Sequence, residues 1–177
     1  MTSRLSLVMV VAVSMLALPT VGGTQGQRSS NASLQDTLNW LRDFLPSATG
    51  ARYDDGSGAN TTTTRLIGSN TCSITMATET VQGYTNNTPE SHGTMRVELS
   101  LADIDSKSIT VTNRQGIVVD LNSPTKSIRV TRSMGGYKNQ SMQSLFWLGN
   151  FNDRSGAERA ANALRHAVDL CAKPQIF

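Results

Sequence analysis

The sequence has few of the residues on which active sites and metal centres are usually built. Two histidines and two cysteines occur among 177 residues, and charged side chains make up only 16% of the chain. No G-x-S-x-G, H-E-x-x-H, C-x-x-C or Walker-type motif is present. The composition therefore gives no support to a metal-dependent or nucleotide-dependent enzyme, and we expect neither a metal nor a cofactor.

The sequence also lacks a strongly basic character and a long hydrophobic run. Its formal net charge is only +3, whereas nucleic-acid-binding domains are usually strongly basic, so we expect no nucleic-acid partner. The longest apolar run, residues 5–18, has about 14 residues, fewer than the roughly 20 that a helix needs to cross a bilayer. Length alone therefore argues against a membrane span.

This apolar run has the layout of a secretory signal peptide. Arg4 precedes the run, Pro19 ends it, and small residues up to Gly23 offer a cleavage site. We therefore predict that residues 1–23 direct export to the periplasm or the cell exterior, with an uncleaved membrane anchor as the alternative. Residues 24–33 are polar without periodicity, which predicts a flexible leader.

Two amphipathic helices are predicted at the ends of the remaining chain. In residues 34–45 the apolar side chains fall on one side of a helical projection, and Ser33 can cap the start. Residues 157–171 show the same one-sided pattern, with Ser155 and Glu158 as a capping box. The many alanines of this second helix favour close packing on a sheet.

Six stretches with strand-like patterns lie between these helices, and their short connections favour an antiparallel meander. They cover residues 71–78, 94–101, 108–111, 117–121, 126–131 and 144–151.

One segment between the first helix and these stretches, residues 47–65, is rich in Gly, Asn, Asp and Thr. We predict that it forms a mobile loop. The predicted fold class is α+β over residues 34–173. It has an N-terminal amphipathic helix, a bent antiparallel sheet of about six strands and a C-terminal helix packed on the sheet, and residues 174–177 form a tail.

The two cysteines are predicted to pair. Cys72 alternates with Ile74 and Met76, and Cys171 ends the apolar side of the last helix, so both point into one core. An even number of cysteines in an exported chain favours a disulfide. The bond would join the last helix to the first strand, and two buried free thiols are the alternative.

Two small groups of residues are candidates for hydrolytic chemistry. His92 lies beside Glu90 and Ser91, and Asp103 lies two residues before Asp105. The aspartates are either a pair of carboxylates for acid–base catalysis or turn residues that hydrogen bond their own backbone. A small secreted hydrolase that uses His92 or Asp103 and Asp105 is therefore the alternative function.

Basic residues dominate the region from 106 to 152, where Asp120 is the only acidic residue. We expect the basic side chains on the outer face and one rim of the sheet. They form a candidate docking face for an acidic protein or anionic lipid headgroups, or else a solvated face that resists edge-to-edge pairing. The residues are Lys107, Arg114, Lys126, Arg129, Arg132 and Lys138.

Four segments carry a resemblance over residues 34–171: "TLNWLRDFL", "LSLADID", "IVVDLNSPTKSIRV" and "AERAANALRHAVDLC". Together they resemble a group of uncharacterised exported bacterial proteins, which implies no activity and carries over no site. The order of elements also resembles the pleckstrin-homology-like superfold, although the extra N-terminal helix departs from it and a cystatin-like fold is the alternative. We expect an exported, non-catalytic binding or interaction module whose ligand is a peptide, an envelope component or an anionic lipid, with a protein or other envelope partner.

Overall fold

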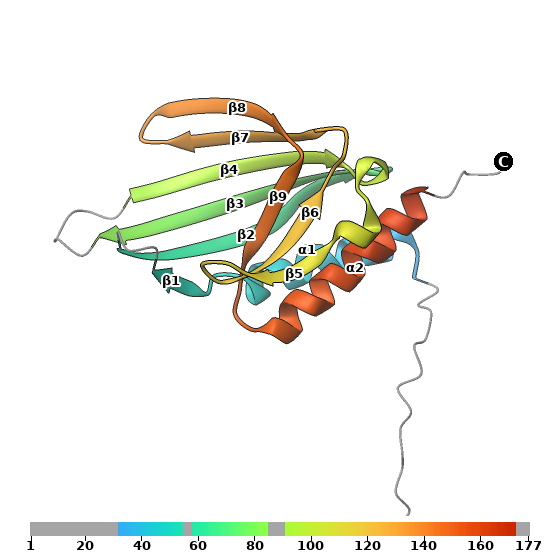
Figure 1. Cartoon of the computed structure of the whole chain (residues 1–177), viewed down its shortest axis with the longest axis horizontal. Helices are drawn as coiled ribbons and strands as arrows, with labels where there is room; N and C mark the ends of the chain where they lie inside the picture. Colours follow the sequence, from blue (N-terminus) through green and yellow to red (C-terminus); the bar gives the residue numbers. More distant parts are fainter. Residues whose placement is uncertain (1–31, 55–57, 85–90, 173–177) are drawn as a thin grey trace, which may run out of the picture. The chain divides into compact units, whose positions relative to one another are not determined.

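The computed structural model describes residues 32–54, 58–84 and 91–172, all within one structural unit. The predicted signal peptide 1–23, the tail 174–177 and most of the leader 24–33 lie outside the described residues. The predicted α+β class is confirmed: two antiparallel sheets of six and three strands are packed with two helices (Figure 1). No helix among the described residues is long and apolar enough to cross a membrane.

Helix α1 (Leu34–Ala48) begins at the predicted cap. The Ser33 hydroxyl accepts a hydrogen bond from the Asp36 backbone N–H at 3.1 Å, and the Asp36 carboxylate accepts one from the Ser33 N–H at 3.2 Å. These hydrogen bonds from Ser33 hold the pKa of Asp36 below its usual range. The helix buries one side against the rest of the fold, through Thr37, Leu38, Leu41 and Leu45.

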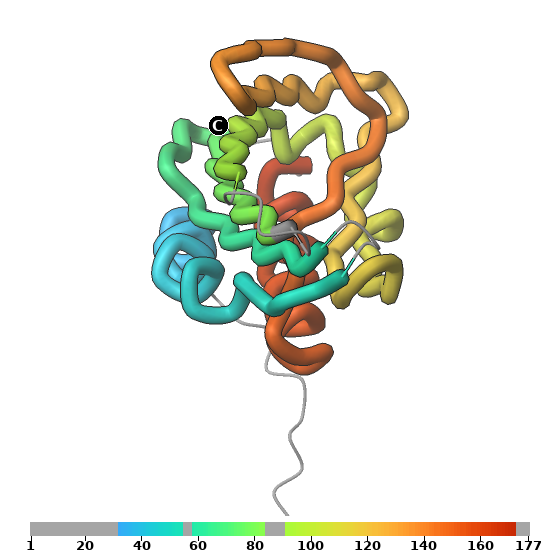
Figure 2. The backbone as a smooth tube through the Cα atoms, turned by 90° about the vertical axis from the view of Figure 1, so that its left-hand side faces the viewer, coloured from blue at the N-terminus to red at the C-terminus, as the bar shows by residue number. Residues whose placement is uncertain are grey.

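Helix α2 (Arg154–Ala172) buries the predicted alanine-rich side. Its cap is Asp153, whose carboxylate accepts a hydrogen bond from the Gly156 N–H at 2.7 Å. The predicted capping box of Ser155 and Glu158 is therefore wrong, because the helix starts one residue before Ser155. Figure 2 shows α1 and α2 side by side, and the Arg159 guanidinium of α2 lies 4.6 Å from the Phe44 ring centroid of α1.

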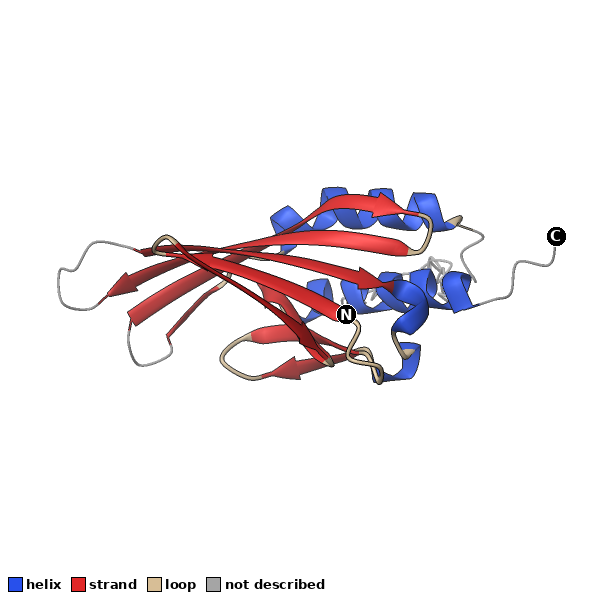
Figure 3. Cartoon of the chain, turned by 90° about the horizontal axis from the view of Figure 1, so that it is seen from above, coloured by secondary structure: helices blue, strands red, loops and turns tan. Residues whose placement is uncertain are grey.

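The large sheet has six antiparallel strands in the order β1-β2-β3-β4-β7-β8. Their bounds are β1 Arg52–Asp54, β2 Gly58–Asn70, β3 Ser73–Tyr84, β4 Ser91–Ser100, β7 Ile128–Met134 and β8 Tyr137–Gln143. The strands of this sheet extend well beyond the helices (Figure 3).

The small sheet has three antiparallel strands in the order β5-β6-β9. These are β5 (Thr110–Asn113), β6 (Ile117–Asn122) and β9 (Leu145–Phe151). The chain leaves the large sheet after β4 through two 3-10 turns, η1 (Leu101–Asp103) and η2 (Ser106–Ser108), and returns to it at β7. The predicted meander in one sheet is therefore wrong, because β7 pairs with β4 and β9 pairs with β6.

The predicted mobile loop 47–65 is also wrong over most of its length. Its first two residues end α1, its middle contains β1, and Gly58–Arg65 is the first part of β2. The β-branched threonines of β2 suit a strand, and they pair with β1 on one side and β3 on the other. This segment has no apolar alternation because its buried positions, such as Thr49, Asn60 and Thr64, are polar.

The core lies on one face of the large sheet, which we call its inner face. Here the register aligns Leu66, Met76, Val97 and Val130 on four neighbouring strands, and all four are buried. Most buried apolar side chains of the small sheet and of both helices belong to the same apolar cluster. The outer face is solvated and carries side chains such as Arg65 and Glu79, which form an ion pair at 2.8 Å.

The predicted disulfide between Cys72 and Cys171 is present, with its Cα atoms 5.7 Å apart. Cys72 lies in the turn between β2 and β3, and Cys171 lies in the last turn of α2. The bond therefore fastens the C-terminal helix to the end of the large sheet at which the apolar core lies.

Candidate functional site

The inner face of the large sheet changes character along its strands. The row Leu66–Met76–Val97–Val130 belongs to what we call the apolar half. The next three rows towards the other end form the polar half. In order, they are Thr64–Thr78–Met95–Arg132, Thr62–Thr80–Gly93–Met134 and Tyr53–Asn60–Gln82–Ser91.

The polar half is held together by side-chain hydrogen bonds between neighbouring strands. The hydroxyls of Thr64 and Thr78 lie 3.2 Å apart, and those of Thr62 and Thr80 lie 3.4 Å apart. Thr64 and Thr78 are buried, whereas Thr62 and Thr80 are partly exposed. Accessibility therefore increases from the first of these rows to the second, whereas Asn60 in the third row is again buried.

The polar half and the exposed side of the small sheet enclose a groove, which we call the inter-sheet groove. It consists of two adjoining hollows of about 320 and 220 Å³ that share Tyr53, Thr80 and Met95. The second hollow also reaches Trp147 of β9 and Arg114 of the β5–β6 turn. Its floor thus comes from the large sheet and one wall from the small sheet.

Trp147 is the most exposed aromatic side chain of the small sheet's wall, with 51% of its surface accessible. The Arg114 guanidinium lies 4.7 Å from the centroid of the Trp147 ring and forms an ion pair with Asp120 at 3.0 Å. Asp120 also accepts a hydrogen bond from the Thr112 hydroxyl at 3.3 Å. Arg114 is therefore held between an indole ring and the carboxylate of Asp120, whose side chain is only 10% exposed.

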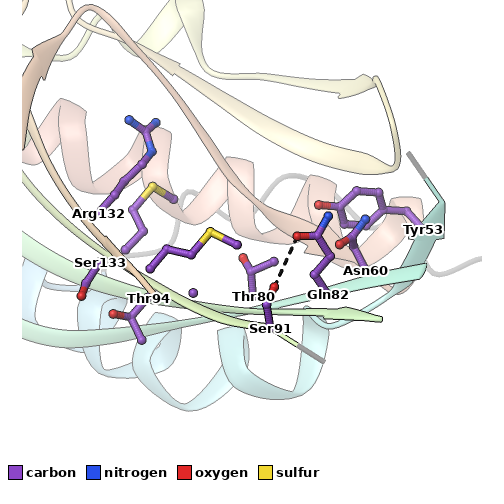
Figure 4. Close-up of a pocket in the computed structure, with 11 residues that line it drawn as sticks. Tyr53, Asn60, Thr80, Gln82, Ser91, Thr94, Arg132 and Ser133 are labelled. Atoms are coloured by element: carbon purple, nitrogen blue, oxygen red, sulfur yellow. Dashed lines mark hydrogen bonds between the residues drawn. The ribbon is translucent and has the colours of Figure 1, made fainter. Parts of the chain in front are cut away.

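Arg132 enters the groove from the floor. The register places it opposite Met95, on the same face as Val130. Figure 4 shows its side chain on the same side of the sheet as those of Gln82 and Tyr53. No carboxylate of the described residues forms an ion pair with Arg132. Its neighbour is neutral, since the Gln143 side-chain oxygen, in the orientation that satisfies the amide, accepts from Arg132 Nη1 at 3.2 Å.

The six basic residues of the predicted docking face do not share one face. Arg129 and Lys138 lie on the outer face, as expected, and Arg129 forms an ion pair with Glu98 at 3.3 Å. Arg132 and Arg114 instead line the groove.

The remaining two of the six are exposed and lie in connections. Lys107 belongs to η2, and Lys126 precedes β7. The expectation that Arg132 lies on the outer face is wrong. Residues two apart in a strand share a face, and Arg132 follows the inward Ile128 and Val130 at this spacing.

The structure separates the residues considered for hydrolysis. His92 is exposed on the outer face of β4 opposite Val81, whereas Asp103 lies in η1 beyond the other end of that strand. The intervening stretch corresponds to about 30 Å of extended chain. Asp105 accepts a hydrogen bond from the Lys107 N–H at 3.0 Å, which fits the alternative of a turn residue. The predicted neighbour Glu90 lies outside the described residues.

The sequence pattern does not single out several groove residues. Tyr53, Asn60 and Thr62 fall in the segment that the pattern predicts as a loop, and Trp147 lies within a continuous apolar run. The run of four threonines before Arg65 was the available signal, because β-branched residues favour strands. Among the described residues no cluster of three or more potential metal ligands occurs.

No protein-family model, curated protein or solved structure matches this chain. The resemblance to exported bacterial proteins and to the pleckstrin-homology-like superfold therefore stays a prediction, and the groove's own residues carry the functional proposal.

Proposed function

We propose that this protein is an exported, non-catalytic binding module that holds its ligand in the inter-sheet groove. The observation that carries the proposal is that the polar half of the large sheet faces the exposed Trp147 across an open space. Ligand sites are usually concave and combine apolar or aromatic surface with a few placed polar groups. The groove has this composition, with Tyr53, Met95 and Trp147 among threonine, asparagine and glutamine side chains.

Export is supported by two independent features. The N-terminal residues have the layout of a signal peptide, and a disulfide of the Cys72–Cys171 kind persists mainly in oxidising compartments. Expression of the full chain followed by cell fractionation and intact-mass analysis tests this part. We expect a cleaved chain that begins near residue 24 in the exported fraction, and an uncleaved chain in the cytosol would contradict it.

Binding in the groove can be tested by filling it. Gly93 lines the groove, its φ is not in the left-handed region, and a Cβ there would meet only Met134, at 3.9 Å. Gly93→Phe therefore places a ring in the groove without disturbing the core. His92→Phe is the matched control, because His92 is the next residue of the same strand and lies on the outer face.

The experiment follows Trp147 fluorescence, and binding by calorimetry, during titration with three kinds of probe: soluble oligosaccharides, short peptides and vesicles containing anionic lipid. We expect the wild type and His92→Phe to bind the same probe equally, and Gly93→Phe to lose that binding at least tenfold. Binding that Gly93→Phe leaves unchanged would contradict the groove as the site. Catalytic turnover of a bound probe would contradict a non-catalytic role.

A further inference from the structure

The charges and the strand arrangement of the groove indicate what kind of ligand it takes. Resting on the proposed function, we infer that the ligand is an acidic oligosaccharide. Its carboxylates are bound by Arg132 and Arg114, and one of its sugar rings lies on Trp147.

The groove is positively charged, and of its two arginines Arg132 has no carboxylate partner among the described residues, whereas Arg114 pairs with Asp120. The described side chains that line it include Arg132 and Arg114 but no aspartate or glutamate. On the outer face, by contrast, arginines such as Arg65 and Arg129 form ion pairs with glutamates. An arginine that lines a hollow without a carboxylate partner is suited to bind one from a ligand, because its guanidinium matches carboxylate geometry.

Arg114 is prepared for the same role in a different way. Its guanidinium is held by Trp147 and Asp120, yet 43% of its side-chain surface remains accessible. The ion pair uses one edge of the guanidinium, through Nη2, and five N–H donors are available in total. The side chain is thus fixed in direction before a ligand arrives, which lowers the entropy lost on binding.

The strand arrangement of the floor favours a saccharide over a peptide. Peptides that bind sheets commonly add a strand to an unpaired edge, where backbone groups supply the hydrogen bonds. The floor strands β3 and β4 are paired on both sides, and β2 is paired with β3 along the groove and with β1 at Ala59–Thr61, so most of the floor offers only side chains to a ligand. These side chains are hydroxyls and amides such as Thr62, Thr80 and Gln82, which suit the hydroxyl groups of a sugar.

Trp147 completes the recognition. Its indole ring is large, rigid and half exposed at the junction of wall and floor. Pyranose rings present a flat face of C–H bonds that packs well on an aromatic ring. The position of Arg114 over the same indole places a carboxylate-binding group beside the ring on which the sugar would lie.

The test uses tetragalacturonate as the probe and its fully methyl-esterified form as the uncharged match. Hexaglutamate serves as the acidic peptide. Binding to the full mature chain is measured by calorimetry at two salt concentrations. Arg132→Gln is the principal variant, and Arg129→Gln is its control, because both residues are exposed arginines of β7 on opposite faces.

We expect tetragalacturonate to bind at least tenfold more tightly than its methyl ester, and more weakly at high salt. Arg132→Gln should weaken its binding about tenfold, while Arg129→Gln leaves it unchanged and Arg132→Lys restores part of it. Gly93→Phe should abolish it. Thermal unfolding of each variant excludes loss of fold as the cause.

Three results would overturn the inference. If the methyl ester binds as tightly as tetragalacturonate, the ligand's charge is not recognised. If hexaglutamate binds as tightly or more tightly, the groove does not prefer a saccharide. If tetragalacturonate does not bind at all, both parts of the inference are wrong. The proposed function is judged separately from this inference. It is supported if Gly93→Phe blocks the binding of any probe, and contradicted if Gly93→Phe leaves that binding unchanged.

Discussion

The two halves of one sheet face in this protein differ in chemistry, although the same strands run through both. In neighbouring rows of the same strands, Leu66 pairs with Met76 in the apolar half, and Thr64 pairs with Thr78 in the polar half. The antiparallel register continues unbroken between these two rows. The difference lies in what faces each row, since the apolar half packs against the small sheet and helices and the polar half borders the groove.

This comparison assigns stability and binding to different halves of the sheet. Burial of apolar side chains is the main favourable term in folding, so the apolar half should hold most of the folding free energy. In the polar half, the accessible hydroxyls and amides cost little because water or a ligand can satisfy them, and the buried hydroxyls of Thr64 and Thr78 hydrogen bond each other. Substitutions in the two halves should therefore change different measured quantities.

The largest expected effect on the free energy of unfolding comes from removing the disulfide at the end of the apolar half. The Cys72→Ser, Cys171→Ser variant frees a loop whose ends are 99 residues apart in sequence. Loop-closure entropy for this length gives a loss of about 4 kcal/mol in the free energy of unfolding. Urea denaturation checks the value, and a loss below about 1 kcal/mol would show that the bond does not stabilise the apolar half.

A matched methionine pair compares the halves directly. Met76 is 1% exposed in the apolar half, whereas Met95 is partly exposed and lines the groove. Met76→Ala should lower the free energy of unfolding by about 3 kcal/mol through the cavity it leaves, and Met95→Ala by less than about 1 kcal/mol. Equal losses in urea denaturation would mean that the core extends into the polar half.

The boundary between the halves depends on Gly149, at the crossing of β9 and β2. Gly149 has a φ of +49°, and a Cβ there would lie 2.7 Å from Thr49 Cγ2. Gly149→Ala should therefore cost about 2 kcal/mol of stability, measured by thermal or urea unfolding. Gly93→Ala in the groove is the control and should change stability by less than about 0.5 kcal/mol. A neutral Gly149→Ala would show that the crossing adjusts freely.

The smallest expected effect concerns the cap of α1. The pKa of Asp36 is lowered in the folded protein by its hydrogen bonds with Ser33, so the carboxylate stabilises the fold above its unfolded pKa. This contribution is lost as the pH falls through the lowered folded pKa. Asp36→Asn should thus be slightly less stable than the wild type at pH 7, with the difference shrinking towards pH 2. A difference that is constant with pH would exclude the charge as its cause.

The parts of the fold that bury apolar side chains could be predicted from the sequence. Both helices and the cores of six strands follow from periodic apolar residues. The sequence pattern does not predict β1, β8 or the first half of β2. Their inward positions are polar or exposed, so apolar and polar residues do not alternate along them. The pairing of β7 with β4 could not be predicted either, because the residue pattern within a strand does not indicate which distant strand it pairs with.

The site was less predictable than the disulfide. Cys72 and Cys171 each continue a buried pattern, which sufficed to pair them. The sequence does indicate that Arg132 points inward, because Arg132 follows Ile128 and Val130 at the two-residue spacing of one strand face. A charged residue in a strand is, however, usually expected to face solvent. Trp147 is exposed between the buried Phe146 and Leu148. Its exposure could not be predicted, because all three residues are hydrophobic and the sequence therefore shows no alternation.

The connections between the two sheets run after β4, after β6 and after β8, and all of them lie at the end of the large sheet where Cys72 is found. Chain connections thus join the two sheets at this end, and backbone hydrogen bonds from Gly50 and Ala51, just before β1, to Asn150 of β9 join them again beside β2. If the groove binds an acidic oligosaccharide as we infer, an internal segment of a longer polymer would enter it from the side, without threading a free terminus.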